Sequence, residues 1–498
     1  MPERDYAHSR ILDVHRWSDH PEANQFVDEI YDSFLTQQES ENISIKKKHL
    51  KVVLLDLYVA WLHDPELCIA VHMAPAAYSN GIVSSKGKSR YNELNIKVST
   101  IDIVHRLDRA GLIGLKLGWR DEHGRSFLTR IWPTDKLVQM FRKAAFGYLD
   151  IGYSDERETI ILRDENKNAI EYEDRPRTKR MRQLMTQYNE LLERTFIDIQ
   201  LLDKPRIELP EKKKRRKDDR PVFVNVSHHD KFVRRIFNNS SFADGGRFYG
   251  GWWQRIDGKH RKNIRMDNIT TVEIDFSALH VILAYAEAGI DYWERMDKDP
   301  YVLPVPDVTN EEHARDIVKL LFLMAFNASD EQALFRAFRS ELDYTKYPYS
   351  FPDKTLLELL ATIKERHPDI AHLICSGAGL RLMNIDARIC EYVIADFVST
   401  GTPILTIHDS FIVPFAEEER LNEVMRDAFN QVTGKDHIKV KYNQNLTKKS
   451  LYALMAQDRS FFQEMFWFMS RGHRPEAGYQ QRRQRHIERY GKPVRMSE

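Results

Sequence analysis

Two aspartates in the second half of the sequence stand where a carboxylate can bind a metal ion. Asp275 follows the alternating residues of TVEI, and Asp409 lies inside LTIHDSFIVP, between two runs of strand-forming residues. They are 134 residues apart in the sequence, yet a strand end and a hairpin can meet on adjacent strands of one antiparallel sheet. Two carboxylates that meet in this way can hold two divalent cations about 4 Å apart, an arrangement that supports in-line phosphoryl displacement.

The hairpin around Asp409 also has a simpler interpretation. Residues 403–407 and 411–413 favour strands, and Ser410 is expected to bend the chain between them. An aspartate between two strands most often serves local backbone hydrogen bonds, and His408 can be a packed hairpin residue. The hairpin alone therefore does not separate a metal ligand from a turn residue.

A pair of cations completes the predicted site. In HARDIVKLLFLMAF, Arg315 and Lys319 are four residues apart, which places them on one face of a helix. Cationic groups on one face can bind the phosphates of a substrate. The alternative is an ordinary solvated helix face.

The elements that must position these residues follow from the sequence pattern. Residues 271–275 favour a strand, and SALHVILAYAEAG continues from it as an apolar helix that Gly289 ends. The chain therefore contains, in order, a strand that ends in a carboxylate and enters a helix, a cationic helix, and a hairpin that carries a second carboxylate.

These three stretches resemble motifs A, B and C of the family A DNA polymerases and the related phage-type single-subunit RNA polymerases. TVEIDFSALH resembles motif A, RDIVKLLFLMAF resembles motif B, and LTIHDSFIVP resembles motif C, in the H-D-S-F form typical of the RNA polymerase branch. The resemblance covers about a third of the chain, from around Gly246 to Phe415. It implies a right-hand polymerase fold with palm, fingers and thumb-like helices.

The resemblance also implies a role for each matching residue. Asp275 and Asp409 would be the catalytic residues and would hold two Mg²⁺ ions, which Mn²⁺ can replace. The incoming nucleotide would be bound by four residues of motifs A and B: Arg315 and Lys319 at its phosphates, His280 at its sugar and Phe326 near the nascent base pair.

Other stretches resemble parts of the same family that contact nucleic acid. WQRIDGKHRKNIR resembles the segment before motif A that touches the primer-template duplex, with Arg261 and Arg265 as the expected contacts. His408 of motif C is expected to contact nucleic acid as well. RLMNIDARICEYVIADFVSTG resembles the palm helix that packs beneath the motif C hairpin.

The sequence departs from the family pattern at positions that affect the nucleotide. Eight residues after Lys319 the family has Tyr followed by Gly, whereas this chain has Asn327. Five residues after Asp275, DNA polymerases have Glu and RNA polymerases have Gly, whereas this chain has His280. A ring there obstructs a ribose better than Gly does, which favours deoxynucleotides, while the H-D-S-F form favours ribonucleotides. The N-terminal half has no three-carboxylate exonuclease pattern, so proofreading is not expected.

Composition limits the class of protein. Of the 498 residues, 42% are hydrophobic and 11% aromatic, enough for about two to four globular domains. Three cysteines, Cys68, Cys375 and Cys390, form neither a disulfide framework nor a zinc pattern, which favours a reducing, cytoplasmic setting. MPERDYAHSR has no apolar signal core, and no stretch approaches the roughly 20 apolar residues of a membrane helix, so no membrane contact is expected.

The net charge is only +1, so affinity for nucleic acid must come from local patches. Two such patches are KKKRRK, at residues 212–217, and the Arg-rich tail at residues 471–495. A charge run of this kind is more often a solvated linker than a binding site. We therefore use the first patch as a domain boundary.

The N-terminal part has its own organisation. Residues 49–64 and 99–111 have helical spacing, with Ser99 or Thr100 as the cap of the second helix. Two alternating stretches, LIGLKLGWRD and RSFLTRIWPT, then resemble a two-stranded wing ahead of a further helix. This order is typical of a winged helix, although a small α+β packing module shows the same pattern.

We therefore predict an α+β protein with four parts. Residues 1–145 would form a helical, winged-helix-like domain, and residues 146–220 a helical connector and basic linker with a long helix over residues 177–202. Residues 221–470 would form the polymerase palm and fingers, and residues 471–498 a basic C-terminal tail.

The sequence favours a template-directed nucleotidyltransferase, and within that class a DNA polymerase of the family A type without proofreading. Its partners would be a DNA template with a primer duplex and nucleoside triphosphates. Two alternatives stay open: a primase or single-subunit RNA polymerase of the same fold, and a non-enzymatic replication-initiation protein that binds DNA and carries a degenerate palm. By analogy, a small polymerase joined to a DNA-reading module would suit a bacterial phage, a plasmid or an integrated mobile element.

Overall fold

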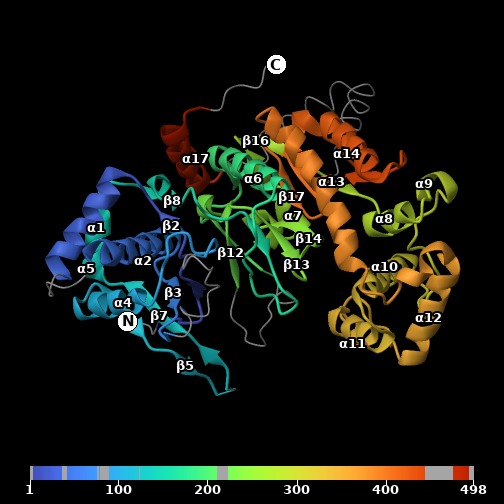
Figure 1. Cartoon of the computed structure of the whole chain (residues 1–498), viewed down its shortest axis with the longest axis horizontal. Coiled ribbons are helices and arrows are strands. Elements are labelled where there is room, and N and C mark those ends of the chain that lie inside the picture. Colours follow the sequence, from blue (N-terminus) through green and yellow to red (C-terminus); the bar gives the residue numbers. More distant parts are fainter. Residues whose placement is uncertain are drawn as a thin grey trace.

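The computed structural model describes residues 4–35, 42–75, 78, 89–122, 124–209, 222–442 and 475–492. Within these ranges the chain has a mixed α+β fold with two hydrophobic cores. The smaller core is drawn from residues 12–151 and the larger from residues 160–438. Figure 1 shows the N-terminal part, in blue, as a lobe beside the larger one.

The N-terminal lobe packs helices against a four-stranded sheet. The strand order is β1-β3-β7-β4, in which β1 runs parallel to β3 and the other pairs are antiparallel. The side chains of Leu54, Val104 and Ile131 are fully buried between the two layers. The elements of this lobe are β1 (Ser9–Ile11), β2 (Arg16–Trp17), α1 (Pro21–Phe34), α2 (Ile43–His63), β3 (Cys68–Val71), α4 (Ser99–Arg109), β4 (Ile113–Lys116), β5 (Trp119–Arg120), β6 (Ser126–Phe127), β7 (Thr129–Pro133) and α5 (Asp135–Lys143).

Helices α2, α4 and α5 lie where the sequence predicts helices, although α2 begins earlier, at Ile43, and α1 was not predicted. The sheet is more extensive than the predicted wing. Ser99 lies inside α4 and does not cap it, since the residue at the cap is Val98 and makes no side-chain bond there. β4 pairs with β7, while β5 and β6 form a separate short hairpin. β1 and β3 complete the sheet from outside the stretch in which the wing was predicted. The winged-helix assignment stays a prediction.

The larger lobe is built on a six-stranded antiparallel sheet. The strand order is β10-β15-β16-β18-β17, and β19 pairs with the C-terminal half of β16. The strands are β10 (Ile197–Ile199), β15 (Ile264–Met266), β16 (Ile269–Phe276), β17 (Leu405–Ile407), β18 (Ser410–Pro414) and β19 (Val440–Tyr442).

Helices cover this sheet and extend beyond it. α6 (Pro176–Arg194) packs into the same core, where the Tyr188 hydroxyl donates to the Ile404 carbonyl at 2.9 Å. In Figure 1 the group formed by α10, α11 and α12 lies at the end of the larger lobe that is farthest from the N-terminal lobe. The helices of the lobe are α6, α7 (Gly258–Arg261), α8 (Leu279–Glu287), α9 (Tyr292–Arg295), α10 (Glu311–Asn327), α11 (Glu331–Glu341), α12 (Asp353–Arg366), α13 (Gly379–Ser399) and α14 (Glu418–Thr433).

A three-stranded sheet and two further strand pairs lie outside the two main sheets. β13 lies between β14, to which it is antiparallel, and β9, to which it is parallel. β2 of the N-terminal lobe pairs with β8, and β11 pairs with β12. These strands are β8 (Gly152–Tyr153), β9 (Ile160–Leu162), β11 (Arg206–Glu208), β12 (Phe223–Asn225), β13 (Arg234–Asn238) and β14 (Ser241–Tyr249).

Two predictions about the connector and the tail need correction. The helix predicted over residues 177–202 ends at Arg194, because the following IDI pairs with β15 as strand β10. The predicted tail contains a helix, α17 (Ala477–Tyr490), which packs on the larger lobe. The basic run at residues 212–217 lies outside the described residues. The predicted domain boundaries and the thumb-like role of α6 stay predictions.

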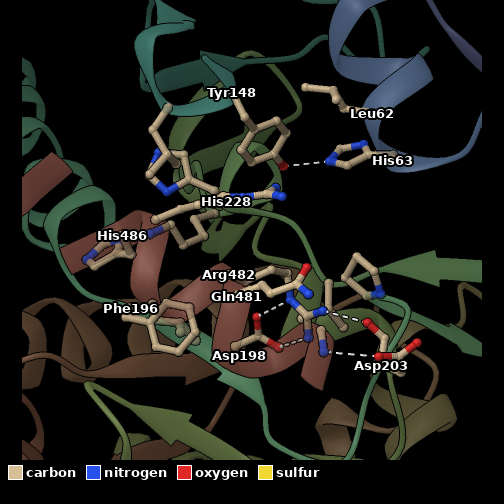
Figure 2. Close-up of a pocket in the computed structure, with 17 residues that line it drawn as sticks. Leu62, His63, Tyr148, Phe196, Asp198, Asp203, His228, Gln481, Arg482 and His486 are labelled. Atoms are coloured by element: carbon tan, nitrogen blue, oxygen red, sulfur yellow. Dashed lines mark hydrogen bonds and ion pairs between the residues drawn. The ribbon is translucent and has the colours of Figure 1, made fainter. Parts of the chain in front are cut away.

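The two lobes and α17 meet around a cavity of about 220 Å³. Figure 2 shows His63 and Tyr148 on one side of this cavity and Arg482 of α17 on the other. The Tyr148 hydroxyl lies 2.5 Å from Nε2 of His63, and Arg482 donates to Asp198 at 2.7 and 3.0 Å. Burial lowers the pKa of His63 to about 3 and that of His486 to about 4, so both rings are neutral at pH 7. Polar groups from both lobes and from α17 line this cavity and connect these three parts of the chain.

The thiols of Cys68, Cys375 and Cys390 are free. In the ranges that the structure describes, no helix has the length and apolar character needed to pass through a bilayer.

Candidate active site

The β17–β18 hairpin presents Asp409 at its tip. Ile407 pairs with Ser410, so the turn consists of His408 and Asp409. His408 has a φ of 58°, in the left-handed region that histidine tolerates better than most residues. The sequence pattern placed the bend at Ser410, but this residue begins β18, where its buried hydroxyl donates to Glu273 at 3.2 Å.

Strand β16 brings Asp275 beside this turn. Asp275 lies opposite Ser410 in the antiparallel ladder, and the backbone N–H of Phe276 donates to the carbonyl of Asp409 at 3.3 Å. The chain then turns through Ala278, whose φ is 56°, into α8. Asp275 therefore lies at the end of the sheet, next to the hairpin tip.

Both carboxylates line one cleft of about 600 Å³. Its walls come from the end of β16, the start of α8, the hairpin turn, α10 and the region of β19. Of the nine site residues predicted from the sequence, the cleft gathers six: Asp275, Asp409, Arg315, Lys319, His280 and His408.

The two carboxylates are close enough to affect each other electrostatically. Burial and the negative charge of Asp409 raise the pKa of Asp275 to about 7, while the charges of Lys441 and Lys319 act in the opposite direction. With respect to the described residues, the Asp409 carboxylate has no ion pair and no hydrogen bond. Two like charges in a partly buried cleft repel each other, and a bound cation removes that repulsion.

The donor set suits a hard divalent cation. Mg²⁺ usually binds through one or two carboxylates together with water and substrate phosphates. Asp275 and Asp409 offer the two carboxylates. Asp291, Glu294 and His437 also have the spacing of metal ligands, but Glu294 and His437 are exposed and Asp291 accepts a hydrogen bond from His437 at 3.0 Å. The cleft therefore fits Mg²⁺ better than this surface cluster does.

Helix α10 supplies cations to the same cleft. It begins after Asn310, whose side chain accepts the backbone N–H of His313 at 3.0 Å. The Arg315 guanidinium donates to Asp299 at 2.7 to 2.9 Å, whereas Lys319 has no ion pair or hydrogen bond within the described ranges. A phosphate can thus meet Lys319 without displacing a partner, whereas Arg315 must first leave Asp299.

His280 lies between the half-buried Arg247 and the buried Asp386. Arg247 donates to Nε2 of His280 at 2.7 Å and to the buried carboxylate of Asp386, also at 2.7 Å. Arginine has only donors, so Nε2 of His280 accepts the hydrogen bond from Arg247, and the same atom lies 3.5 Å from Oδ2 of Asp386. The ring therefore has a fixed orientation beside Asp275.

Phe326 does not line the cleft. Its ring is fully buried and lies 5.2 Å from that of Phe322, measured between ring centroids. Its position on α10 turns it to the core, and Asn327 is the residue that lines the cleft. The expected stacking of Phe326 near a base pair is therefore corrected to a packing role.

Arg261 and Arg265 also lie outside the cleft. Arg261 donates to both carboxylate oxygens of Glu273, at 2.8 and 3.0 Å, and Glu273 accepts the hydroxyl of Ser410 in the hairpin. Arg265 donates to the side chain of Gln200 at 3.0 Å. The structure thus places Arg261 in a charged network beneath the hairpin, and a contact between either arginine and a duplex stays a prediction.

Sequence reasoning missed the contribution of β19. Lys439 and Lys441 line the cleft, and Lys441 lies 3.1 Å from Asp275. The stretch IKVKY alternates cationic and apolar residues, a period that puts both lysines on one face of a strand. This signal was available, but it lies outside the three motifs. Other cleft residues that were missed are Arg247, Trp293, Asp299 and Tyr301.

Comparison with known proteins finds a weak structural likeness over part of this chain. No family model matches the chain, and no curated protein matches it. A solved structure, the POL domain of Pol1 from M. smegmatis in complex with DNA primer-template and dNTP, aligns at 12% identity with a TM-score of 0.29. The alignment covers 42% of this chain and 47% of that one, so the chain spans less than half of the length of that structure. A likeness of this strength carries no argument about fold or function.

Proposed function

We propose that this chain is a template-directed nucleotidyltransferase, and specifically a DNA polymerase of the family A type that acts without proofreading. One observation carries the proposal: Asp275 and Asp409 come together from distant parts of the chain and share a cleft with Lys319 and Arg315. Two carboxylates opposite a cationic helix are what in-line transfer of a nucleotidyl group requires.

Asp275 and Asp409 would hold two divalent ions, which would supply Lewis acidity at the attacking 3′-hydroxyl and at the transferred phosphate. Cationic residues of the chain bind the phosphates of the nucleotide. The ammonium of Lys319 binds the terminal phosphates and offsets the charge that develops on the departing pyrophosphate. Arg315 joins it by exchanging Asp299 for a phosphate, which matches the geometry of a guanidinium.

The fixed ring of His280 supports a preference for deoxynucleotides. His280 follows Asp275 by five residues and is held by Arg247 in one orientation, so it cannot turn aside at low cost to admit a bulkier sugar. A 2′-hydroxyl needs more room beside this ring than a 2′-hydrogen does, so the ring disfavours a ribonucleotide.

A primase or RNA polymerase of the same fold is the second candidate. It is favoured by the H-D-S-F form of the hairpin, residues 408–411. A non-enzymatic DNA-binding protein with a degenerate palm is less favoured, because the carboxylates of Asp275 and Asp409 and the ammonium of Lys319 are all retained in one cleft.

A single panel of incorporation assays tests these candidates. The purified chain is given labelled dNTPs or rNTPs, a primed or an unprimed DNA template, and either Mg²⁺ or EDTA. We expect Mg²⁺-dependent incorporation of dNTPs on the primed template. Incorporation of rNTPs without a primer would favour the primase, and no incorporation under any condition would favour the DNA-binding protein.

A further inference from the structure

Strand β19 delivers a lysine to the first carboxylate of the candidate site. Its backbone is fixed by pairing with β16, in a register that sets Lys441 opposite Asp275. The carbonyl of Lys439 also accepts the N–H of Ser277 at 2.8 Å. The Lys441 ammonium lies 3.1 Å from Oδ2 of Asp275.

This ammonium and a divalent ion compete for the same oxygen. A lysine that donates to Oδ2 of Asp275 occupies a lone pair that a metal ion needs. Two like charges a few ångströms apart in a partly buried cleft repel each other. An ion that binds between Asp275 and Asp409 must therefore displace the ammonium of Lys441.

The displaced side chain has freedom to move. Half of the Lys441 side chain is exposed, at 50%, whereas that of Asp275 is 17% exposed. The backbone is held in the ladder, but the four-carbon stem of lysine is flexible. Lys439 differs, because it is paired with Asp297 and lies over the Trp293 ring at 4.3 Å.

We propose that Lys441 is a displaceable counter-ion of the site: it pairs with the ionised carboxylate of Asp275 while no metal is bound, and when a divalent ion takes its place the ammonium binds a phosphate of the incoming nucleotide. The first step needs only the carboxylate pair, while the second rests on the proposed function. After displacement the ammonium remains in the cleft that it shares with Lys319 and Arg315. Phosphate oxygens are the anionic groups that the proposed substrate brings there.

The first step is tested by Mn²⁺ binding without nucleotide, measured by electron paramagnetic resonance of free Mn²⁺. Lys441→Met keeps the length of the stem and removes the charge, so we expect it to bind Mn²⁺ at least about fivefold more tightly than wild type. Lys354→Met is the matched control, since Lys354 lies on α12, outside the cleft, with its side chain 88% exposed, and its Mn²⁺ affinity should equal that of wild type. Asp275→Asn should abolish this binding.

The second step is tested by nucleotide binding with Mn²⁺ at saturation, using a non-hydrolysable dNTP analogue. Lys441→Met should weaken analogue binding by about tenfold, and Lys441→Arg should restore most of it. Circular dichroism and urea unfolding of each variant verify that the fold is kept.

The outcomes separate this inference from the proposed function. If Lys441→Met leaves Mn²⁺ affinity unchanged or weaker, or if Asp275→Asn still binds Mn²⁺ like wild type, the counter-ion role is overturned even when the wild type extends primers. If Lys441→Met binds Mn²⁺ more tightly but the wild type incorporates no nucleotide, the counter-ion step stands and the polymerase proposal falls. If analogue binding is unaffected by Lys441→Met, the phosphate step is overturned.

Discussion

Asp275 and Ser410 are partners in the antiparallel ladder between β16 and β18, and this register brings Asp409 to Asp275. A slip of one residue would turn every side chain of β18 to the opposite face. The register is held by the hydrogen bond from Ser410 to Glu273 and by the buried side chains of Phe411 and Val413. The catalytic proposal therefore depends on packing beneath the hairpin as much as on the aspartates.

Removing Lys319 should weaken transfer without unfolding the protein. Lys319→Ala should lower kcat/KM for the nucleotide by about a hundredfold, because a cation at the departing phosphates is lost. Single-nucleotide primer extension measures the effect. Lys354→Ala is the matched control, since Lys354 lies on α12 with its side chain 88% exposed, and it should extend primers like wild type. Equal loss in both variants would contradict a specific role for Lys319.

His280 should set the choice of sugar. His280→Gly removes the ring that Arg247 holds in place, so we expect the ratio of kcat/KM for dNTP to that for rNTP to fall by at least about tenfold. His280→Gln is the matched control, because its side chain still occupies the space. An unchanged ratio in His280→Gly would show that the sugar does not approach this ring.

The raised pKa of Asp275 makes the metal-free protein less stable as the pH rises. The pKa of an aspartate in an unfolded chain is near 3.9, whereas the pKa of folded Asp275 is about 7. The folded state therefore keeps a proton that the unfolded state releases. The free energy of unfolding should therefore fall between pH 4 and pH 7, by on the order of 4 kcal/mol from this group.

Urea unfolding in EDTA at several pH values measures this effect, with Asp275→Asn as the reference that lacks the titrating group. Groups that titrate in both proteins cancel in the comparison. The two proteins should differ in their pH dependence over this range, and parallel curves would contradict the raised pKa. Since a metal must displace the same proton, Mn²⁺ affinity should rise with pH up to about 7 and then level off.

The pair of Arg261 and Glu273 should act on stability. Arg261→Ala leaves the buried carboxylate of Glu273 without its bidentate partner, which should lower the free energy of unfolding by about 3 kcal/mol. The double variant Arg261→Met with Glu273→Leu removes both charges and should recover most of that loss. If Arg261→Ala instead leaves stability unchanged and weakens duplex binding, Arg261 contacts the duplex, as the sequence resemblance implies.

The sequence predicted the parts of the site that depend on local pattern. Period-two alternation located β16, and four-residue spacing placed Arg315 and Lys319 on one helix face, because these patterns are set by backbone geometry. The hairpin was predicted as well, but its turn lies one residue earlier than expected, since Ser410 is drawn into β18 by its bond to Glu273.

The parts that depend on tertiary partners could not be predicted in the same way. Whether Phe326 faces the core or the cleft depends on how α10 packs. Whether Arg261, at the end of α7, is free depends on Glu273, which lies on β16. Lys441 reaches Asp275 only because β19 pairs with the C-terminal half of β16, a long-range pairing that no local pattern specifies.

Extension of a primed DNA template by the wild type, by Asp275→Asn and by Asp409→Asn decides whether Asp275 and Asp409 together support nucleotidyl transfer. We expect the wild type to extend the primer with dNTPs in Mg²⁺, and each variant to lose at least about a thousandfold in rate while it binds the primed template like wild type. Extension by either variant at a rate close to that of the wild type would contradict the claim.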